Sequence, residues 1–124
     1  MSRVAEVERK TKETQIRIRI DLDGSGESEV GTGIGFFDHM LTAFARHGLF
    51  DLRIDAKGDL EIDPHHTVED VGILLGKVID KALGDKVGLV RYGWAVVPMD
   101  EALILTSIDI SGRGMLCYDV PIEQ

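Results

Sequence analysis

Apolar and polar side chains alternate near the start of the chain. Over residues 15–22 the polar positions fall on one face of an extended segment and the apolar positions on the other. The apolar set is Ile16, Ile18, Ile20 and Leu22. A period of two is typical of a strand with one buried face. The sequence D-G-S-G at residues 23–26 predicts the turn that ends this strand, and a shorter extended piece is expected before it, over residues 3–9.

Two later segments change to the spacing of a helix. Residues 35–47 and residues 66–83 repeat apolar side chains three and four positions apart, which predicts two amphipathic helices. Gly48 and Gly84 are expected to stop them, because glycine readily adopts the backbone conformation that ends a helix. Pro64 marks the start of the second helix. The predicted buried face of that helix includes Val68, Val71, Leu75, Val78 and Leu83.

The remaining segments are expected to be extended, with one or two short strands in residues 50–63 and further strands from Tyr92 onward. Sliding the sequence by 88 positions aligns the first strands with these later ones without a gap. Eight aligned pairs are identical: Arg3 with Arg91, Glu13 with Glu101, Ile16 with Ile104, Ile20 with Ile108, Asp21 with Asp109, Gly24 with Gly112, Gly26 with Gly114, and Ile34 with Ile122. Any two amphipathic strands that end in D-x-x-G look partly alike, but the gapless match favours an internal duplication.

The duplication predicts the fold class. We expect an α+β protein built from a duplicated β-β-α-β-α half-domain, with helices packed between two mixed β-sheets. Residues 1–88 form the first half-repeat and residues 89–124 start the second. In this alignment Gln124 corresponds to Phe36, so the second half is expected to be incomplete in this chain, without the two helices of the first.

Charge and cysteine content narrow the function classes. Fourteen basic residues against 22 acidic ones give a net charge of −8, which disfavours a nucleic-acid or anionic-membrane surface. A single cysteine, Cys117, excludes an internal disulfide and fits a reducing compartment. The charged first 15 residues do not resemble a signal peptide, and the apolar runs are short for a membrane span. These features predict a cytoplasmic protein.

The strongest chemical signal is H-H-T-V-E at the start of the second predicted helix. His65 and Glu69 are four residues apart and share a helix face, whereas His66 points about 100° away from His65. This spacing predicts ligands for two neighbouring metal ions better than for one. Imidazole and carboxylate donors suit Mn, Fe, Co, Ni or Zn, and Asp63 and Asp70 are candidate partners that fix the imidazole tautomers. The alternative is a solvated helix N-terminus, where acids are favourable.

Other candidate residues carry weaker signals. His39, in F-F-D-H-M-L, is the natural additional metal ligand, although taken alone it is better explained as a histidine on a helix surface. His47 also fits a cation that favours a helix C-terminus. Arg91 and Arg113 flank the later strands and are candidates to bind a phosphate as forked donors, although surface arginines are common. Glu13 is a carboxylate at the start of a strand.

Several stretches together resemble one enzyme family, imidazoleglycerol-phosphate dehydratase of histidine biosynthesis. The matching stretches are RKTKETQIRIRIDLDGSG, TGIGFFDHML, HGLFDLRIDAKGDLEIDPHHTVEDVGILLGK, RYGWAVVPMDEAL and DISGRG. The resemblance implies a Mn-dependent lyase that removes water from imidazoleglycerol phosphate to give imidazole acetol phosphate. It also implies two manganese ions per site, and a homo-oligomer in which trimers form a 24-subunit shell.

The resemblance also implies roles for individual residues. His39 and His66 match ligands of one manganese ion, and His65 and Glu69 match ligands of the other. Glu13 matches a catalytic carboxylate that contacts the substrate and moves protons. The small phosphorylated imidazole substrate is implied to contact one further set of residues: Glu13, His39, His47, His65, Glu69, Arg91 and Arg113.

One departure from the family keeps a second hypothesis open. All four histidines precede residue 67, whereas the family carries a second lone histidine and a second HHxxE-type sequence in its second half. The chain is therefore either the working dehydratase or a truncated, non-catalytic metal-binding or oligomerising remnant of it. An unrelated dinuclear metallohydrolase ranks last, because it needs more carboxylate ligands than H-H-T-V-E offers.

Overall fold

The computed structural model describes residues 3–122, which divide into two compact units. Unit 1 runs up to Asp85 and unit 2 starts at Lys86, and each is described by itself. The predicted repeat boundary at residue 88 lies near this division but is a statement about ancestry, and it stays a prediction.

Unit 1 contains a four-stranded sheet. Its strands are β1 (Val4–Lys10), β2 (Thr14–Asp21), β3 (Ser28–Gly31) and β4 (Asp51–Gly58). They lie in the order β1-β2-β4-β3, and the β3–β4 pair is parallel while the other two pairs are antiparallel. The sheet is therefore mixed, as expected. β3 was not predicted, because it is four residues long and only Val30 in it is partly buried.

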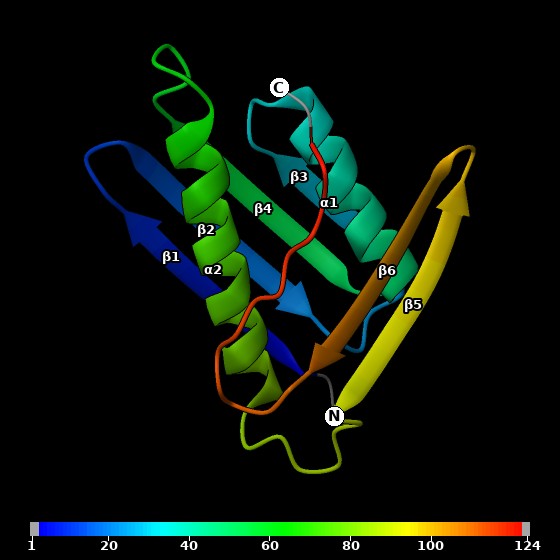
Figure 1. Ribbon diagram of the computed structural model, residues 1–124. Helices are drawn as coiled ribbons and strands as arrows, with labels where there is room; N and C mark the ends of the chain where they lie inside the picture. The colour runs from blue at the N-terminus through cyan, green and yellow to red at the C-terminus, as the bar shows by residue number, and fades with distance from the viewer. Residues whose placement is uncertain (1–2, 123–124) are drawn as a thin grey trace. The chain divides into compact units, whose positions relative to one another are not determined.

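Two helices cover one face of this sheet. Figure 1 shows α1 (Gly35–Gly48) and α2 (His65–Leu83) lying side by side across the strands, with their N-termini at the same end of the unit. The turn between β1 and β2 and the loop between β4 and α2 lie at that end too. The fold thus gathers the starts of both helices, where His39, His65 and His66 occur, whereas His47 lies in the last turn of α1.

The alternation in β2 sets the core of unit 1. Ile16, Ile18 and Ile20 are at most 2 % exposed, whereas Arg17 and Arg19 between them face solvent. The helices add further buried apolar side chains: Leu41, Ala45, Val71, Leu74, Val78 and Ala82. The period-two and helical predictions are confirmed here, since burial of these faces is what stabilises both kinds of element.

The predicted buried face of α2 is partly wrong. Val71 and Val78 are fully buried as expected, and Leu75 is partly buried against the core. Val68 is exposed, however, and Leu74, which was not predicted, lies in the core. Both leucines fit a helical period, so the pattern alone could not fix the rotation of the helix about its axis.

The two helix ends also differ from each other. α1 extends through Gly48 and stops at Leu49, which adopts a left-handed conformation with φ 58°, so the predicted stop at Gly48 is wrong by one residue. α2 stops at Gly84, as predicted. Leu49 donates its backbone N–H to the carbonyl of Ala45, which satisfies one of the helix's terminal acceptors.

Unit 2 contains one antiparallel pair of strands, β5 (Tyr92–Met99) and β6 (Ala102–Asp109). Adding 88 to the bounds of β2 gives those of β6, and the pairing of Val4 with Asp21 becomes that of Tyr92 with Asp109. The α+β class with two sheets and two helices is confirmed. Among residues 86–122, however, the second sheet is this antiparallel pair and is not mixed.

The longest helix, α2, carries charged side chains along its length, and no helix in residues 3–122 is long and apolar enough to span a membrane.

Candidate metal and substrate site

The start of α2 is fixed by its own loop. Pro64 precedes the helix, and its carbonyl accepts the backbone N–H of Val68 at 3.0 Å. The Asp63 carboxylate accepts the backbone N–H of His65 at 2.7 Å, which satisfies one of the donors that a helix N-terminus leaves free. The first two side chains of the helix, His65 and His66, are thereby presented at the end of the unit.

His65 and Glu69 form a pair on one face of α2, as their spacing predicted. The Nε2 atom of His65 lies 3.2 Å from Oε2 of Glu69, and both side chains are more than half exposed. Two donors at adjacent positions around an ion, each about 2.1 Å from it, lie about 3 Å apart. The observed separation therefore suits two ligands of one cation.

His66 faces a different direction. Its ring is nearly perpendicular to that of His65, at 86°, with the ring centroids 5.4 Å apart. Its Nδ1 lies 2.8 Å from Oδ2 of Asp59, the residue that follows β4. The two imidazoles do not converge on one point, in agreement with the predicted division between two ions.

The carboxylate beside His66 was missed by the sequence analysis. Asp63 and Asp70 were expected to fix the imidazole tautomers, but Asp63 caps the backbone of His65 and Asp70 accepts from Thr14 Oγ1 at 2.5 Å. Asp59 takes this role for His66 instead. Its contact depends on how the loop from β4 to α2 folds back, and no residue spacing encodes that.

Asp70 instead joins the helix to the sheet. Its side chain is mostly buried, and Arg9 Nε lies 3.6 Å from its second oxygen. The neighbouring Thr67 is fully buried, and a Cβ at Gly58 would lie 1.9 Å from its Oγ1. The end of β4 therefore passes very close to the first turn of α2, which only glycine at position 58 allows.

Glu13 lies at the same end of unit 1. It is exposed in the turn between β1 and β2, and its backbone N–H donates to Thr11 Oγ1 at 3.1 Å. The hydrogen bond that His66 donates to the Asp59 carboxylate is the largest cause that raises the pKa of His66. Partial burial opposes it, and the charges of Asp59, Glu13 and Asp63 add to it. The Glu13 carboxylate is thus close enough to His66 for its charge to help raise the pKa of His66.

The two histidines of α1 are separated along the helix. His39 is the fifth residue of α1 and belongs to the end where α2 also starts, whereas His47 is in the last turn. At 1.5 Å per residue, about 12 Å along the axis separates them. Both side chains are exposed.

Arg91 and Arg113 belong to unit 2. The Arg91 guanidinium donates from Nε to Oδ1 of Asp109 at 2.6 Å and lies over the ring of Tyr92 at 5.1 Å. A second donor of Arg91 reaches Oδ2 of Asp109 at 3.2 Å, which leaves three of its five N–H groups for a ligand. Arg113 is exposed, and its backbone N–H donates to Ser111 Oγ at 3.1 Å.

The chemistry of these donors fits a divalent transition metal, but only as part of a coordination shell. The pair of His65 and Glu69 supplies one imidazole nitrogen and one carboxylate oxygen at a suitable separation. No group of three or more His, Cys, Asp and Glu side chains suited to an ion lies among residues 3–122. His39 therefore does not complete a ligand group within these residues.

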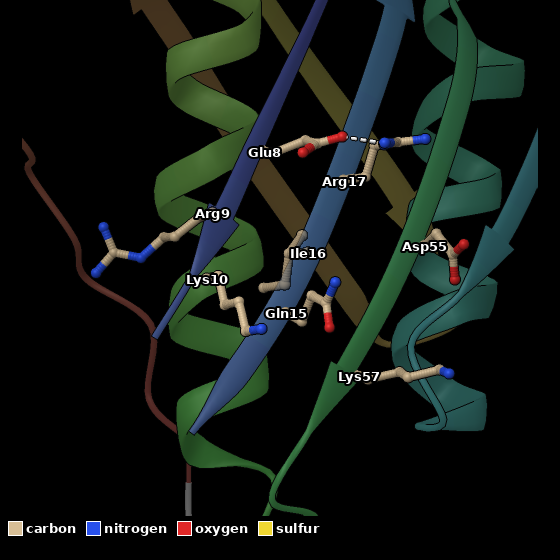
Figure 2. Close-up of a pocket in the computed structure, with 8 residues that line it drawn as sticks. All are labelled: Glu8, Arg9, Lys10, Gln15, Ile16, Arg17, Asp55 and Lys57. Carbon is tan, nitrogen blue, oxygen red and sulfur yellow. Dashed lines mark hydrogen bonds and ion pairs between the residues drawn. The ribbon is translucent and has the colours of Figure 1, made fainter. Parts of the chain in front are cut away.

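A separate hollow lies on the outer face of the sheet of unit 1. It is an open groove of about 510 Å³ across β1, β2 and β4, lined by Lys10, Gln15 and Lys57 among others. Figure 2 shows Glu8 and Arg17 joined across two strands on this face. The groove carries paired charges, and none of the predicted site residues line it.

Comparison with known proteins identifies similar chains. The family model described as imidazoleglycerol-phosphate dehydratase matches residues 32–124. Proteins of that name from Acidiphilium cryptum and from a Thermoanaerobacter species are each 60 % identical, over 100 % and 98 % of this chain. The chain spans 63 % and 62 % of their lengths.

Two solved structures of the same description are also similar. The imidazoleglycerol-phosphate dehydratase of Staphylococcus aureus matches with a TM-score of 0.84 and 37 % identity, covering 98 % of this chain and 66 % of its own. The Pyrococcus furiosus protein, solved in complex with (S)-C348, matches with a TM-score of 0.75 and 42 % identity, covering 94 % and 61 %.

Proposed function

Because the chain belongs to the imidazoleglycerol-phosphate dehydratase family, we propose that it carries part of the active site of a manganese-dependent dehydratase of histidine biosynthesis. The reaction is loss of water from imidazoleglycerol phosphate to give imidazole acetol phosphate. The observation that carries this proposal is the arrangement at the start of α2. There, His65 and Glu69 lie 3.2 Å apart on one face while His66 faces another direction.

The metal ligands divide between two ions in this proposal. His65 and Glu69 hold one manganese ion through Nε2 and a carboxylate oxygen. His66 and His39 belong to the other, supported by the common end of the unit at which both helices start. When bound, the ions supply Lewis-acid charge to the imidazole ring of the substrate. These side chains do not gather into a group of three or more within residues 3–122, so each ion needs further ligands to complete its shell.

Glu13 is the proposed acid–base group. The proton to be removed from the substrate is on a carbon without an adjacent carbonyl, so a positioned carboxylate is needed to move it. The effect of the Glu13 charge on His66 supports its place beside the metal ligands. Its exposure leaves the carboxylate open to a substrate.

The proposed substrate contacts extend beyond the metal ligands. Arg91 and Arg113 bind the phosphate group, since guanidinium N–H groups form forked hydrogen bonds to phosphate oxygens. His47 is a further proposed contact with the substrate. The net charge of −8 supports a small ligand over nucleic acid or a membrane surface as the partner. We place the protein in the cytoplasm as a homo-oligomer built from trimers into a 24-subunit shell.

A non-catalytic remnant is the second candidate. It is supported by the absence of a complete ligand group in residues 3–122 and by the apolar residues that β5 and β6 leave exposed. Such a chain would bind manganese weakly or self-associate through its apolar surface, without turning over substrate.

Turnover of imidazoleglycerol phosphate separates the two candidates. The purified 124-residue chain is incubated with substrate and Mn²⁺, with a chelator in a parallel sample. We expect chelator-sensitive turnover that is lost in His66→Ala and kept in Lys77→Ala, an exposed position further along α2. No turnover by a chain that circular dichroism shows to be folded would favour the remnant.

A further inference from the structure

Asp59 and His66 form a contact that neither the family resemblance nor the ligand set explains. Asp59 directly follows β4, and His66 is the second residue of α2. The Nδ1 atom of His66 lies 2.8 Å from Oδ2 of Asp59, and the Asp59 side chain is 16 % exposed against 42 % for His66. The carboxylate therefore holds the inner edge of a half-exposed imidazole.

The backbone on both sides makes this contact rigid. Gly58 and Thr67 are the next residues inward, and a Cβ at Gly58 would lie 1.9 Å from Thr67 Oγ1. The backbone carbonyl of Asp59 accepts the N–H of Ile62 at 2.9 Å, which closes a turn immediately after the strand. The strand end and the helix start are thus pressed together, and Asp59 has little freedom to leave His66.

The chemistry of the contact decides which ring nitrogen is bare. A carboxylate accepts hydrogen bonds and does not donate them, so the Nδ1 atom facing it carries the proton. The lone pair of the neutral ring is then on Nε2, on the far side from Asp59. Histidines that bind metals usually donate their other N–H to a carboxylate in this way, which fixes both the tautomer and the ring direction.

If the contact served only to join the loop to the helix, it would be energetically unfavourable. The other oxygen of Asp59, Oδ1, is buried without a hydrogen-bond partner among residues 3–122. Leaving a buried carboxylate oxygen unpaired is unfavourable, so a neutral side chain or an apolar one would join this loop to the helix at lower cost. A role in orienting the imidazole accounts for a carboxylate at this position.

We propose that Asp59 is a positioning residue of the metal site, whose carboxylate holds His66 by Nδ1–H and directs Nε2 outward as a donor to manganese. This inference rests on the proposed function, because it takes His66 to be a ligand. Asp59 itself contacts neither the ion nor the substrate.

Two measurements on the 124-residue chain test the proposal. The first determines the His66 tautomer in the metal-free chain by long-range ¹H–¹⁵N correlation NMR, at a pH where the ring is neutral. We expect the Nδ1–H form, retained in Asp59→Asn, whose amide oxygen still accepts, and lost in Asp59→Ala. Glu61→Ala is the matched control, because it removes a carboxylate from the same loop without touching His66.

The second measurement is Mn²⁺ affinity, followed by the EPR signal of the free ion. We expect Asp59→Ala to weaken binding about 10–100-fold, Asp59→Asn to weaken it less, and Glu61→Ala to leave it close to that of the unaltered chain. His66→Ala defines the part of the binding that depends on this ligand. Thermal unfolding of each variant identifies any loss that comes from misfolding alone.

The outcomes separate the positioning role from the proposed function. Two results would overturn the positioning role while leaving the metal site in place. One is Mn²⁺ binding that depends on His66 but is as strong in Asp59→Ala as in Glu61→Ala. The other is a His66 ring that carries its proton on Nε2 in the unaltered chain. If the unaltered chain shows no binding that depends on His66, the proposed metal function fails at this residue, and the role of Asp59 toward the ion fails with it.

Discussion

The strand pairs β1–β2 and β5–β6 have the same register, but equivalent side chains in them are buried to different extents. Ile20 pairs with Ala5 in the first, and the equivalent Ile108 pairs with Gly93 in the second. Ile20 is fully buried under the helices of unit 1, whereas Ile108 is 56 % exposed. Local pairing therefore forms the strands in both units, but burial depends on the elements that pack on them.

The outer faces of the two pairs differ even more. In unit 1, Arg17 of β2 pairs with Glu6 and Glu8 of β1. The positions equivalent to Glu6 and Arg17 are Trp94 and Leu105, which are 79 % and 74 % exposed. A charged outer face suits a sheet that meets water, while an apolar one is typical of a surface that another structure covers.

The difference in burial between Ile20 and Ile108 predicts the largest effect, a difference in the free energy of unfolding. Ile20→Ala should lower the free energy of unfolding by about 2–5 kcal/mol, because it leaves a cavity in a packed core. Ile108→Ala should change it far less, since its side chain is already half exposed. Urea denaturation of both variants measures the difference. Equal losses would mean that unit 2 is packed in solution as tightly as unit 1.

The junction between β4 and α2 predicts the next effect. Gly58→Ala places a Cβ against the buried Thr67 hydroxyl and should cost about 1–3 kcal/mol. Gly93→Ala, in the strand of unit 2, meets no atom within 4 Å and should be nearly neutral. Thermal unfolding of the two variants tests this, and a stable Gly58→Ala chain would show that the junction can relax.

The outer faces predict a difference in self-association. Leu105→Lys introduces a charge into the apolar face of β5–β6 and should raise the concentration at which the chain self-associates by about 10- to 150-fold, since burying a leucine is worth about 1.5–3 kcal/mol. Arg17→Lys at the equivalent position in unit 1 keeps the charge and serves as the control. Sedimentation velocity over a concentration series measures the change, and an unaltered series would argue against this face as the contact.

The smallest effect concerns two carboxylates with lowered pKa values. Backbone N–H groups of Ser25 and Glu27 lower the pKa of Asp51 in unit 1, and the Arg91 guanidinium lowers that of Asp109 in unit 2. Because the pKa of each carboxylate is lower in the folded chain, each stabilises the fold fully at a pH above its unfolded pKa of about 3.9. This stabilisation is lost as the pH falls through the folded pKa.

Salt should distinguish these two carboxylates. At about 1 M salt the screening length is roughly 3 Å, so the pKa of the exposed, ion-paired Asp109 should rise toward its ordinary value. The pKa of Asp51 should move less, because it is lowered by hydrogen bonds at 2.9 and 3.0 Å from backbone N–H groups, which carry no net charge for salt to screen. Carboxyl NMR titration at two salt concentrations checks this, and equal shifts would contradict the assigned causes.

The same comparison explains what the sequence could predict. Period two predicted β2, and the match at a shift of 88 related the later strand β6 to it, because both signals lie in the local sequence. The pairing of His65 with Glu69 followed from helix geometry alone. β3 was not predicted, because it pairs with β4, which is distant in sequence. The contact of Asp59 with His66 was missed for a similar reason, since it requires the loop after β4 to fold back on α2.

The cover that α2 provides for β2 also has a consequence during synthesis. The β1–β2 hairpin is complete at Asp21, but the last buried residue of α2 is Ala82, about 60 residues later. At about 5–20 residues per second, a ribosome needs roughly 3–12 s to make that segment. For those seconds we expect the isoleucine face of the hairpin to be open to water, as the kind of apolar surface that makes chaperones necessary during synthesis.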